Sequence, residues 1–215
     1  MMHAYDESYL ADAKDHLGDL FDYTVNTLGM DLRDAFERFA YSSVGEMFEK
    51  GHPLFLAGMS GSDLARRVLE ATGQPGPYPK YEFTGYSREY WTGWALAHFQ
   101  WFSGICFKDI DRYGLPIEDT RELYDPLHEA DISKFLEIAG ARVKLPACTL
   151  KEQRAHAGFT QAELARRSGV PLRLIRAYEQ RTVALSHAEA GTAMRLARAL
   201  HCDVGSLVGG MITTK

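Results

Sequence analysis

The sequence predicts an all-α protein with two domains, and its periodicity and helix caps support that fold class. Apolar residues recur at steps of three and four through most of the chain, which is the period of an amphipathic helix. Ser, Thr or Asp stands before many of these runs and Gly follows several of them, as expected for helix ends. We therefore expect an N-terminal helical domain followed by a second, smaller helical domain.

The charge of the chain is divided unevenly between its two halves. Residues 1–140 hold 12 Lys and Arg against 24 Asp and Glu, a net charge of −12. Residues 141–215 hold 12 against 5, a net charge of +7. Such asymmetry is typical of two modules with different partners, although two independently solvated surfaces would produce the same division.

Helices are predicted along almost all of the first half. The segment 74–85 is the exception, because its prolines favour an extended connector. The segment 87–112 has Trp91, Trp94 and Trp101 at helical spacing with apolar residues between them, so we expect a helix buried on most sides. The first two predicted helices are 9–28, closed by Gly29, and 31–48, capped by Asp31 and ended by the sequence GHP at 51–53. The next two run from Ser60 or Ser62 to Gly73 and over 87–112, where Ser87 opens the helix. The last two begin with Pro116 as the first residue and with Asp131 or Ser133, the latter running to about Ala139.

The second half begins after a predicted linker. We expect an acidic helical domain over 1–143, a linker over 144–148 and a basic domain over 149–210. The predicted helices of the basic domain are 149–157, 161–168, 171–179, 188–200 and 203–208.

Composition bears on the setting in which the protein acts. No apolar run approaches the roughly 18 residues that cross a bilayer, and the start of the chain lacks the basic and apolar pattern of a signal peptide. The cysteines Cys106, Cys148 and Cys202 stand far apart, without a CxxC pair. We therefore expect reduced thiols in a cytoplasmic protein.

Residues 159–180, FTQAELARRSGVPLRLIRAYEQ, predict two short helices joined by a sharp turn. Thr160 followed by Glu163 has the spacing of a capping box. Gly169 stands where the chain must turn, because Gly enters the left-handed region at little cost, and Val170 is expected to be buried under the turn.

The second of these helices is predicted to have one buried and one outward face. Pro171 begins it with a φ that already suits a helix. Ile175 and Tyr178 face inward, three residues apart. The outward positions are then Leu172, Arg173, Arg176 and Ala177. A rigid helix held outward by a tight turn is the arrangement of a DNA recognition helix.

Residues 149–208 resemble the phage-repressor/Cro-type (XRE-like) helix-turn-helix family. The resemblance is carried by LKEQRAHAGFTQAELARRSGVP, IRAYEQ and MRLARALHCDVGSLV, in the order of the family. It implies a five-helix DNA-binding domain in a transcriptional regulator, usually a repressor that binds palindromic DNA as a homodimer. The loop RTVALSHAEAG after Gln180 is a few residues longer than usual.

The resemblance implies roles for individual residues. Arg173 and Arg176 match positions that read bases, and Arg can hold guanine O6 and N7 with two hydrogen bonds, which favours a half-site containing G. Arg154 and Glu179 match an internal ion pair. For Arg166 and Arg167 the sequence leaves two roles open: attracting DNA, or forming the solvated face of a helix. The implied DNA-binding residues are Thr160, Gln161, Pro171, Leu172, Arg173, Arg176, Ala177, Gln180 and Arg181.

A dimer face is expected near the end of the basic domain. Val204, Leu207, Val208 and Met211 could form it, although core packing explains the first three equally well.

The acidic half carries no pattern that indicates catalysis, so we expect no enzyme, no cofactor and no metal. His128, Glu129 and Asp131 lack a second His at ligand spacing. The three tryptophans are explained first as core residues and second as a ligand box. The strings YWTGWALAHFQW and HEADISKF are similar to helical regions of bacterial regulators, some of them encoded beside toxin-like genes.

Two functions compete on these observations. In the first, the protein is a repressor and an antitoxin, whose acidic half binds a basic toxin and whose basic half regulates its own operon. In the second, it is a repressor whose acidic half binds a small molecule or mediates oligomerisation.

Overall fold

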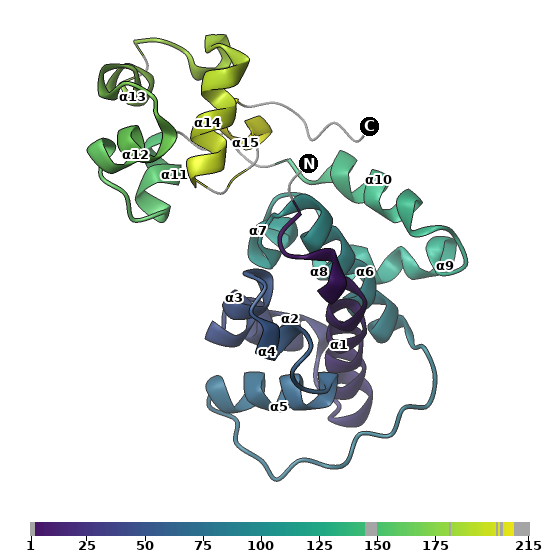
Figure 1. Cartoon of the computed structure of the whole chain (residues 1–215). Coiled ribbons are helices and arrows are strands. Elements are labelled where there is room, and N and C mark those ends of the chain that lie inside the picture. Colours follow the sequence, from purple (N-terminus) through teal and green to yellow (C-terminus); the bar gives the residue numbers. More distant parts are fainter. Residues whose placement is uncertain (1–2, 145–149, 181, 201, 203, 209–215) are drawn as a thin grey trace. The chain divides into compact units, whose positions relative to one another are not determined.

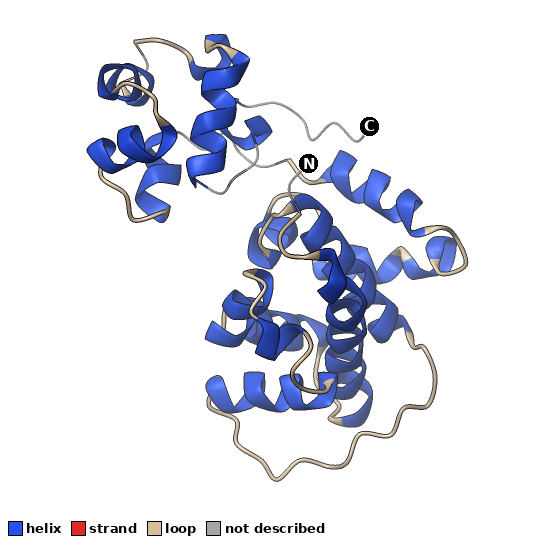
Figure 2. Cartoon of the chain, viewed as in Figure 1, coloured by secondary structure: helices blue, strands red, loops and turns tan. Residues whose placement is uncertain are grey.

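The structure of the chain is a computed structural model that describes residues 3–144, 150–180, 182–200, 202 and 204–208 (Figure 1). Within these residues every regular element is a helix and none is a strand, so the predicted all-α class is confirmed (Figure 2). No described helix is long and apolar enough to cross a membrane. The chain divides into two compact units, 1–143 (unit 1) and 144–215 (unit 2). Most of the predicted linker, with Cys148, lies outside the described residues.

Unit 1 is built around two long helices, α1 and α6, which lie side by side (Figure 1). Shorter helices cover them. The elements of unit 1 are η1 (Glu7–Tyr9), α1 (Leu10–Asp22), the π-helical turn η2 (Tyr23–Thr27), α2 (Leu32–Ala40), α3 (Ser43–Glu49), α4 (Pro53–Leu56), α5 (Gly61–Ala71), α6 (Arg88–Ser103), α7 (Phe107–Arg112), α8 (Ile117–Glu122), α9 (Tyr124–Leu127) and α10 (Ile132–Arg142).

The close packing of α1 on α6 depends on glycine. A Cβ atom added to Gly93 of α6 would lie 2.2 Å from the carbonyl oxygen of Leu17 in α1. A Cβ added to Gly18 would lie 2.8 Å from the ring of Tyr90. The two helices therefore meet backbone to backbone, and any larger side chain at position 93 would force them apart.

Four predicted helix caps are confirmed in unit 1. In each, the side-chain oxygen accepts a hydrogen bond from a backbone N–H in the first turn, which satisfies one of the donors left unpaired at a helix start. The capping residues are Asp31, Ser60, Ser87 and Asp131.

Two predicted helices are each broken into two. The helix predicted over 31–48 ends at Ala40, because Ser42 adopts extended backbone angles and caps a new helix through the N–H of Gly45. The helix predicted over 87–112 ends at Ser103, because Gly104 takes a left-handed conformation with φ of 68°. Helical periodicity continues through both breaks, and therefore the sequence pattern alone did not show them.

The connector predicted over 74–85 contains no described helix, as expected. Two tyrosines attach it to the start of η2 and the end of α1. The hydroxyl of Tyr23 donates to the carbonyl of Pro79 at 2.7 Å, and the hydroxyl of Tyr81 donates to Asp22 at 2.9 Å.

Unit 2 contains α11 (Leu150–His156), α12 (Gln161–Ser168), α13 (Leu172–Glu179), η3 (Leu185–His187), α14 (Ala190–Leu200) and α15 (Val204–Val208). The predicted helices match these bounds closely. The largest difference is at α14, which was predicted to begin at 188 and begins at Ala190, after the short turn η3. The buried core of unit 2 consists of Leu150, Leu164, Val170, Ile175, Tyr178, Leu196, Ala197, Leu200 and Leu207.

Candidate nucleic-acid interface

The start of α12 is fixed by the predicted capping box. The hydroxyl of Thr160 accepts from the N–H of Glu163 at 3.2 Å, and the Glu163 carboxylate accepts from the N–H of Thr160 at 2.7 Å. Two backbone donors that a helix start would leave unpaired are therefore satisfied. The hydroxyl of Thr160 serves this internal role.

The turn between α12 and α13 is tight because Gly169 adopts φ of 66°, as predicted. The hydroxyl of Ser168 donates to the carbonyl of Leu164 at 2.6 Å and accepts from the N–H of Val170 at 3.2 Å. Val170 is 1% exposed, so its predicted burial is confirmed. Pro171 occupies the N-cap with ψ of 134°, and α13 begins one residue later than predicted, at Leu172. Pro116, predicted as the first residue of a helix, likewise occupies the N-cap, and α8 begins one residue later at Ile117.

Helix α13 presents two different faces. Ile175 and Tyr178 are buried in the core of unit 2, as predicted. Arg173 and Arg176 are exposed, and among the described residues neither guanidinium has a hydrogen-bond or ion-pair partner. Of the other residues implied in DNA binding, Pro171 and Gln180 are exposed and Leu172 and Ala177 are half-buried, while Arg181 lies outside the described residues.

Helix α12 thus packs on both α13 and α14 (Figure 1), and one face of α13 is exposed. Residues 150–207 match the family model described as helix-turn-helix. This segment is a helix-turn-helix domain of the phage-repressor/Cro type. The match marks the protein as a DNA-binding regulator of transcription. No curated protein and no solved structure is significantly similar to the chain.

Three side chains tie the helix-turn-helix domain together at one point. The guanidinium of Arg154 in α11 donates through Nε and Nη2 to the Glu179 carboxylate at the end of α13, at 2.6 and 3.1 Å. The amide of Gln161 at the start of α12 donates to the same carboxylate at 2.8 Å. Sequence reasoning paired Arg154 with Glu179 but did not place Gln161 on the same acid.

The hydrogen bonds from Arg154 and Gln161 change the pKa of the buried Glu179 carboxylate. Its side chain is 4% exposed, and that of Arg154 is 15% exposed. Burial alone raises the pKa of Glu179, but the hydrogen bonds from Arg154 and Gln161 outweigh it and hold the pKa below its ordinary value. Glu179 therefore stays ionised, and its charge orients helices α11, α12 and α13 against one another.

The two arginines that the sequence left open are placed differently. The guanidinium of Arg167 lies 4.3 Å from the ring centroid of Phe159, which is a cation–π contact within the domain. Arg166 is exposed. Sequence reasoning missed the contact between Phe159 and Arg167, whose eight-residue separation spans the start of α12.

After α13, the structure agrees with the core-packing alternative for Leu207 and Val204, and it describes one contact of the longer loop. The hydroxyl of Thr182 donates to the carbonyl of Ala177 at 3.0 Å, which fastens the start of the longer loop to α13. Leu207 is 5% exposed within the core, and Val204 packs against that core. The side chain of Val208 and the whole of Met211 lie outside the described residues.

Proposed function

We propose that the protein binds a specific operator with α13 in the major groove. The observation that carries the proposal is the contrast between the two faces of this helix. Ile175 and Tyr178 fix it in the core, while Arg173 and Arg176 extend from the exposed face without partners among the described residues. Arginines held in this way are suited to bidentate contact with guanine, and a half-site containing G is expected.

The neighbouring positions complete the proposed interface. Pro171, Leu172 and Ala177 lie along α13, where small and apolar side chains suit contact with a thymine methyl group. The proposed contacts to the DNA backbone come from Gln180 and Arg181. Thr160 and Gln161, whose hydroxyl hydrogen and second amide hydrogen have no acceptor among the described residues, are proposed to contact DNA at the start of α12, with Gln161 meeting a phosphate or a base edge. Because residues 141–215 carry a net charge of +7, affinity should fall steeply as salt concentration rises.

One recognition helix reads few base pairs, so the proposed binding form is a homodimer on a palindromic operator. In such a dimer the two copies of α13 would meet half-sites one helical turn apart, which requires roughly 10 base pairs between the centres of the half-sites. The repressor role and the cytoplasmic setting belong to the same proposal.

The test replaces Arg173 and Arg176 with alanine in the full chain and measures operator binding by fluorescence anisotropy, using sites first selected from random DNA. We expect specific binding to be lost while the far-UV circular dichroism is unchanged. The matched control is Arg198→Ala, which removes an exposed arginine from α14. Normal binding by the double variant would show that the contacts with DNA are assigned wrongly.

For unit 1 we propose the role of an antitoxin that binds a basic toxin, with autoregulation of the shared operon. The net charge of −12 over residues 1–140 supports a basic partner. The experiment co-expresses the full chain with the product of the adjacent gene. Rescue of growth and co-purification of the two proteins are the expected results, and a neighbour product that neither binds nor is neutralised would count against this role.

A second role for unit 1 is ligand sensing, and one observation favours it. A cavity of about 430 Å³ opens where α1, α6, α9 and α10 meet, and its lining includes Trp91 and Trp94. Ligand cavities commonly have volumes of about 300–1,000 Å³ with mostly apolar and aromatic walls. Under this role a bound ligand changes operator affinity; a metabolite retained by the purified protein would distinguish it from the antitoxin.

A further inference from the structure

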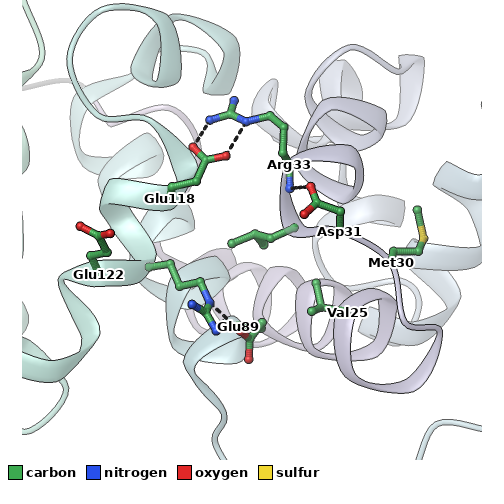
Figure 3. A pocket seen from close by; sticks show the side chains of 9 residues that line it. Val25, Met30, Asp31, Arg33, Glu89, Glu118 and Glu122 are labelled. Atoms are coloured by element: carbon green, nitrogen blue, oxygen red, sulfur yellow. Dashed lines mark hydrogen bonds and ion pairs between the residues drawn. The ribbon is translucent and has the colours of Figure 1, made fainter.

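Two cavities in the described part of unit 1 have similar volumes and different linings, one mostly charged and one mostly aromatic. The first has a volume of about 370 Å³ and lies between α2, α6 and α8 (Figure 3). Four of its charged groups form two pairs: Arg33 donates to Glu118 at 2.8 Å, and Arg121 donates to the buried Glu89 at 2.7 Å. These ion pairs join helices that are distant in sequence, and we assign them a structural role.

The second cavity, here named the aromatic cavity, is walled by rings from separate helices. Trp91 of α6 stands nearly perpendicular to Tyr124 and to Phe135, at ring-centroid distances of 5.9 and 5.5 Å. These edge-to-face rings line part of the cavity. The lining residues are Asp15, Tyr86, Tyr90, Trp91, Trp94, Tyr124, Leu127, His128, Ala130, Ile132 and Phe135.

The rings of the aromatic cavity already attract cations of the protein itself. The ammonium of Lys14 lies 4.5 Å from the centroid of Trp94, and the guanidinium of Arg88 lies 5.5 Å from that of Tyr124. The face of an aromatic ring is electron-rich, so a positive charge is favoured there and a negative charge is not.

A carboxylate adds negative charge to the same cavity. Asp15 of α1 accepts a hydrogen bond of 2.9 Å from the hydroxyl of Tyr90, which fixes its position at the lining. Arg88, by contrast, is neutralised by Asp125 at 2.5 Å. The net charge of −12 over residues 1–140 also favours a cation over an anion.

We propose that the aromatic cavity binds a small organic ammonium compound, with its charged nitrogen beside Asp15 and its apolar body against Trp91 and Tyr124. The apolar body displaces water from ring surfaces, and the ammonium donates hydrogen bonds to the carboxylate. An organic anion would meet both the Asp15 charge and the negative faces of the rings. This inference deepens the ligand-sensing role and rests on it.

The test compares three probes that share one phenyl ring and differ in charge: 2-phenylethylammonium, 2-phenylethanol and phenylacetate. Their binding to the full chain is measured by isothermal titration calorimetry. We expect the ammonium to bind about threefold to tenfold more tightly than the alcohol, the size of a partly exposed cation–π and ion-pair contribution. Phenylacetate should bind most weakly. Equal affinity for the three probes, or no binding of the ammonium at millimolar concentration, would overturn the proposal.

Variants of α1 and α6 locate the binding within the cavity. Asp15→Asn keeps an acceptor for Tyr90 and removes the charge, so the ammonium should lose about threefold to tenfold in affinity while the alcohol is unaffected. The matched control is Asp12→Asn, which removes an exposed charge from the same helix outside the lining. Trp94→Leu should weaken both probes; if that variant does not fold, Tyr124→Leu serves the same purpose.

Two further measurements separate this inference from the proposals above. The Arg173→Ala, Arg176→Ala double variant should bind 2-phenylethylammonium normally, because its changes lie in unit 2. If the ammonium binds the wild-type chain and operator affinity does not change, the ligand class stands and the sensing role fails. A lysine-containing peptide that binds in the cavity where the small ammonium does not would assign the site to a protein partner and overturn the inference.

Discussion

Units 1 and 2 hold their helices together by different means. In unit 2 two polar contacts are local, the capping box and the serine under the turn, and a third, the carboxylate shared by Arg154 and Gln161, joins three helices beside the apolar core. In unit 1 the contacts between helices are mostly distant in sequence, as where Gly93 of α6 meets the backbone of Leu17 and where Arg33 is paired with Glu118. The comparison explains why a short segment of unit 2 could be interpreted residue by residue, whereas unit 1 could not.

The comparison predicts that removing one partner of the shared carboxylate has the largest effect on unit 2. Arg154→Ala leaves the Glu179 carboxylate buried without the two hydrogen bonds from Arg154, and the free energy of unfolding of unit 2 should fall by about 3–5 kcal/mol. Chemical denaturation followed by circular dichroism measures the loss. A variant as stable as the wild type would show that the network does not hold unit 2 together.

The pH dependence of the same pair has a definite sign. The pKa of Glu179 is lowered in the folded state, so its contribution to stability is present above the pKa of an unfolded glutamate, about 4.3, and is lost as pH falls through the folded value. The penalty of Arg154→Ala should therefore become smaller in acid, where Glu179 is protonated in the variant. A penalty that is constant with pH would contradict the assignment to charge.

A single methyl group should produce the next largest effect, and only in unit 1. Gly93→Ala places a Cβ against the carbonyl of Leu17, and we expect a loss of about 3 kcal/mol because two backbones must separate. Tryptophan fluorescence reports unit 1 selectively, since Trp91, Trp94 and Trp101 all lie there. Gly191→Ala in unit 2 is the control, followed by circular dichroism: position 191 has open space within a helix, and alanine there should be neutral or stabilising by up to about 1 kcal/mol.

A titratable histidine in unit 1 should give a moderate effect. Burial lowers the pKa of His98 to about 4, with Lys14 and His3 adding to the shift. The neutral ring is thus favoured in the folded state, and its stability is complete above about pH 6.5 and declines as pH falls toward 4. The loss should be on the order of 1–2 kcal/mol, below the full shift because the ring is partly exposed. His98→Gln should show a smaller decline in the free energy of unfolding of unit 1 between pH 7 and pH 5, monitored by tryptophan fluorescence; an equal decline would assign the pH dependence to other groups.

The smallest predicted effect concerns the start of α12. Thr160→Ala removes the side-chain acceptor of the capping box and should cost about 1 kcal/mol of stability, whereas Thr160→Ser keeps the acceptor and should cost less. Thermal unfolding of unit 2 by circular dichroism compares the two variants. If both lose the same amount, the cap is not the cause.

Apart from the Arg154–Glu179 pair, which the family resemblance implied, the parts predicted from the sequence are those where a side chain acts within a few residues of itself. The caps Asp31, Ser87 and Thr160 and the turn at Gly169 all follow from local stereochemistry. The breaks at Ser42 and Gly104 were missed, because apolar periodicity runs through them and the competing cap or left-handed residue decides the outcome.

The contacts that build the cavities of unit 1 were not predictable in the same way. Trp91 and Trp101 are buried, as the core interpretation predicts, and Trp91 also lines the aromatic cavity together with the half-buried Trp94. The indole N–H of Trp101 donates to the backbone carbonyl of Tyr5 at 2.9 Å. The helical spacing of the three tryptophans predicts the same environment for all of them. What separates them is which of the helices α1, α9 and α10 lies opposite, and this depends on contacts over dozens of residues.

The open face of α13 has a consequence for protein engineering. Within the described part of the chain, the side chains of Arg173 and Arg176 hold nothing in place, whereas Ile175 and Tyr178 carry the packing of the same helix. Under the proposed interface, the residues that stabilise this eight-residue helix and the residues that would contact DNA therefore lie on different faces of it. The exposed residues can be substituted together, and a library varied at these positions alone would explore new target sequences on an unchanged scaffold.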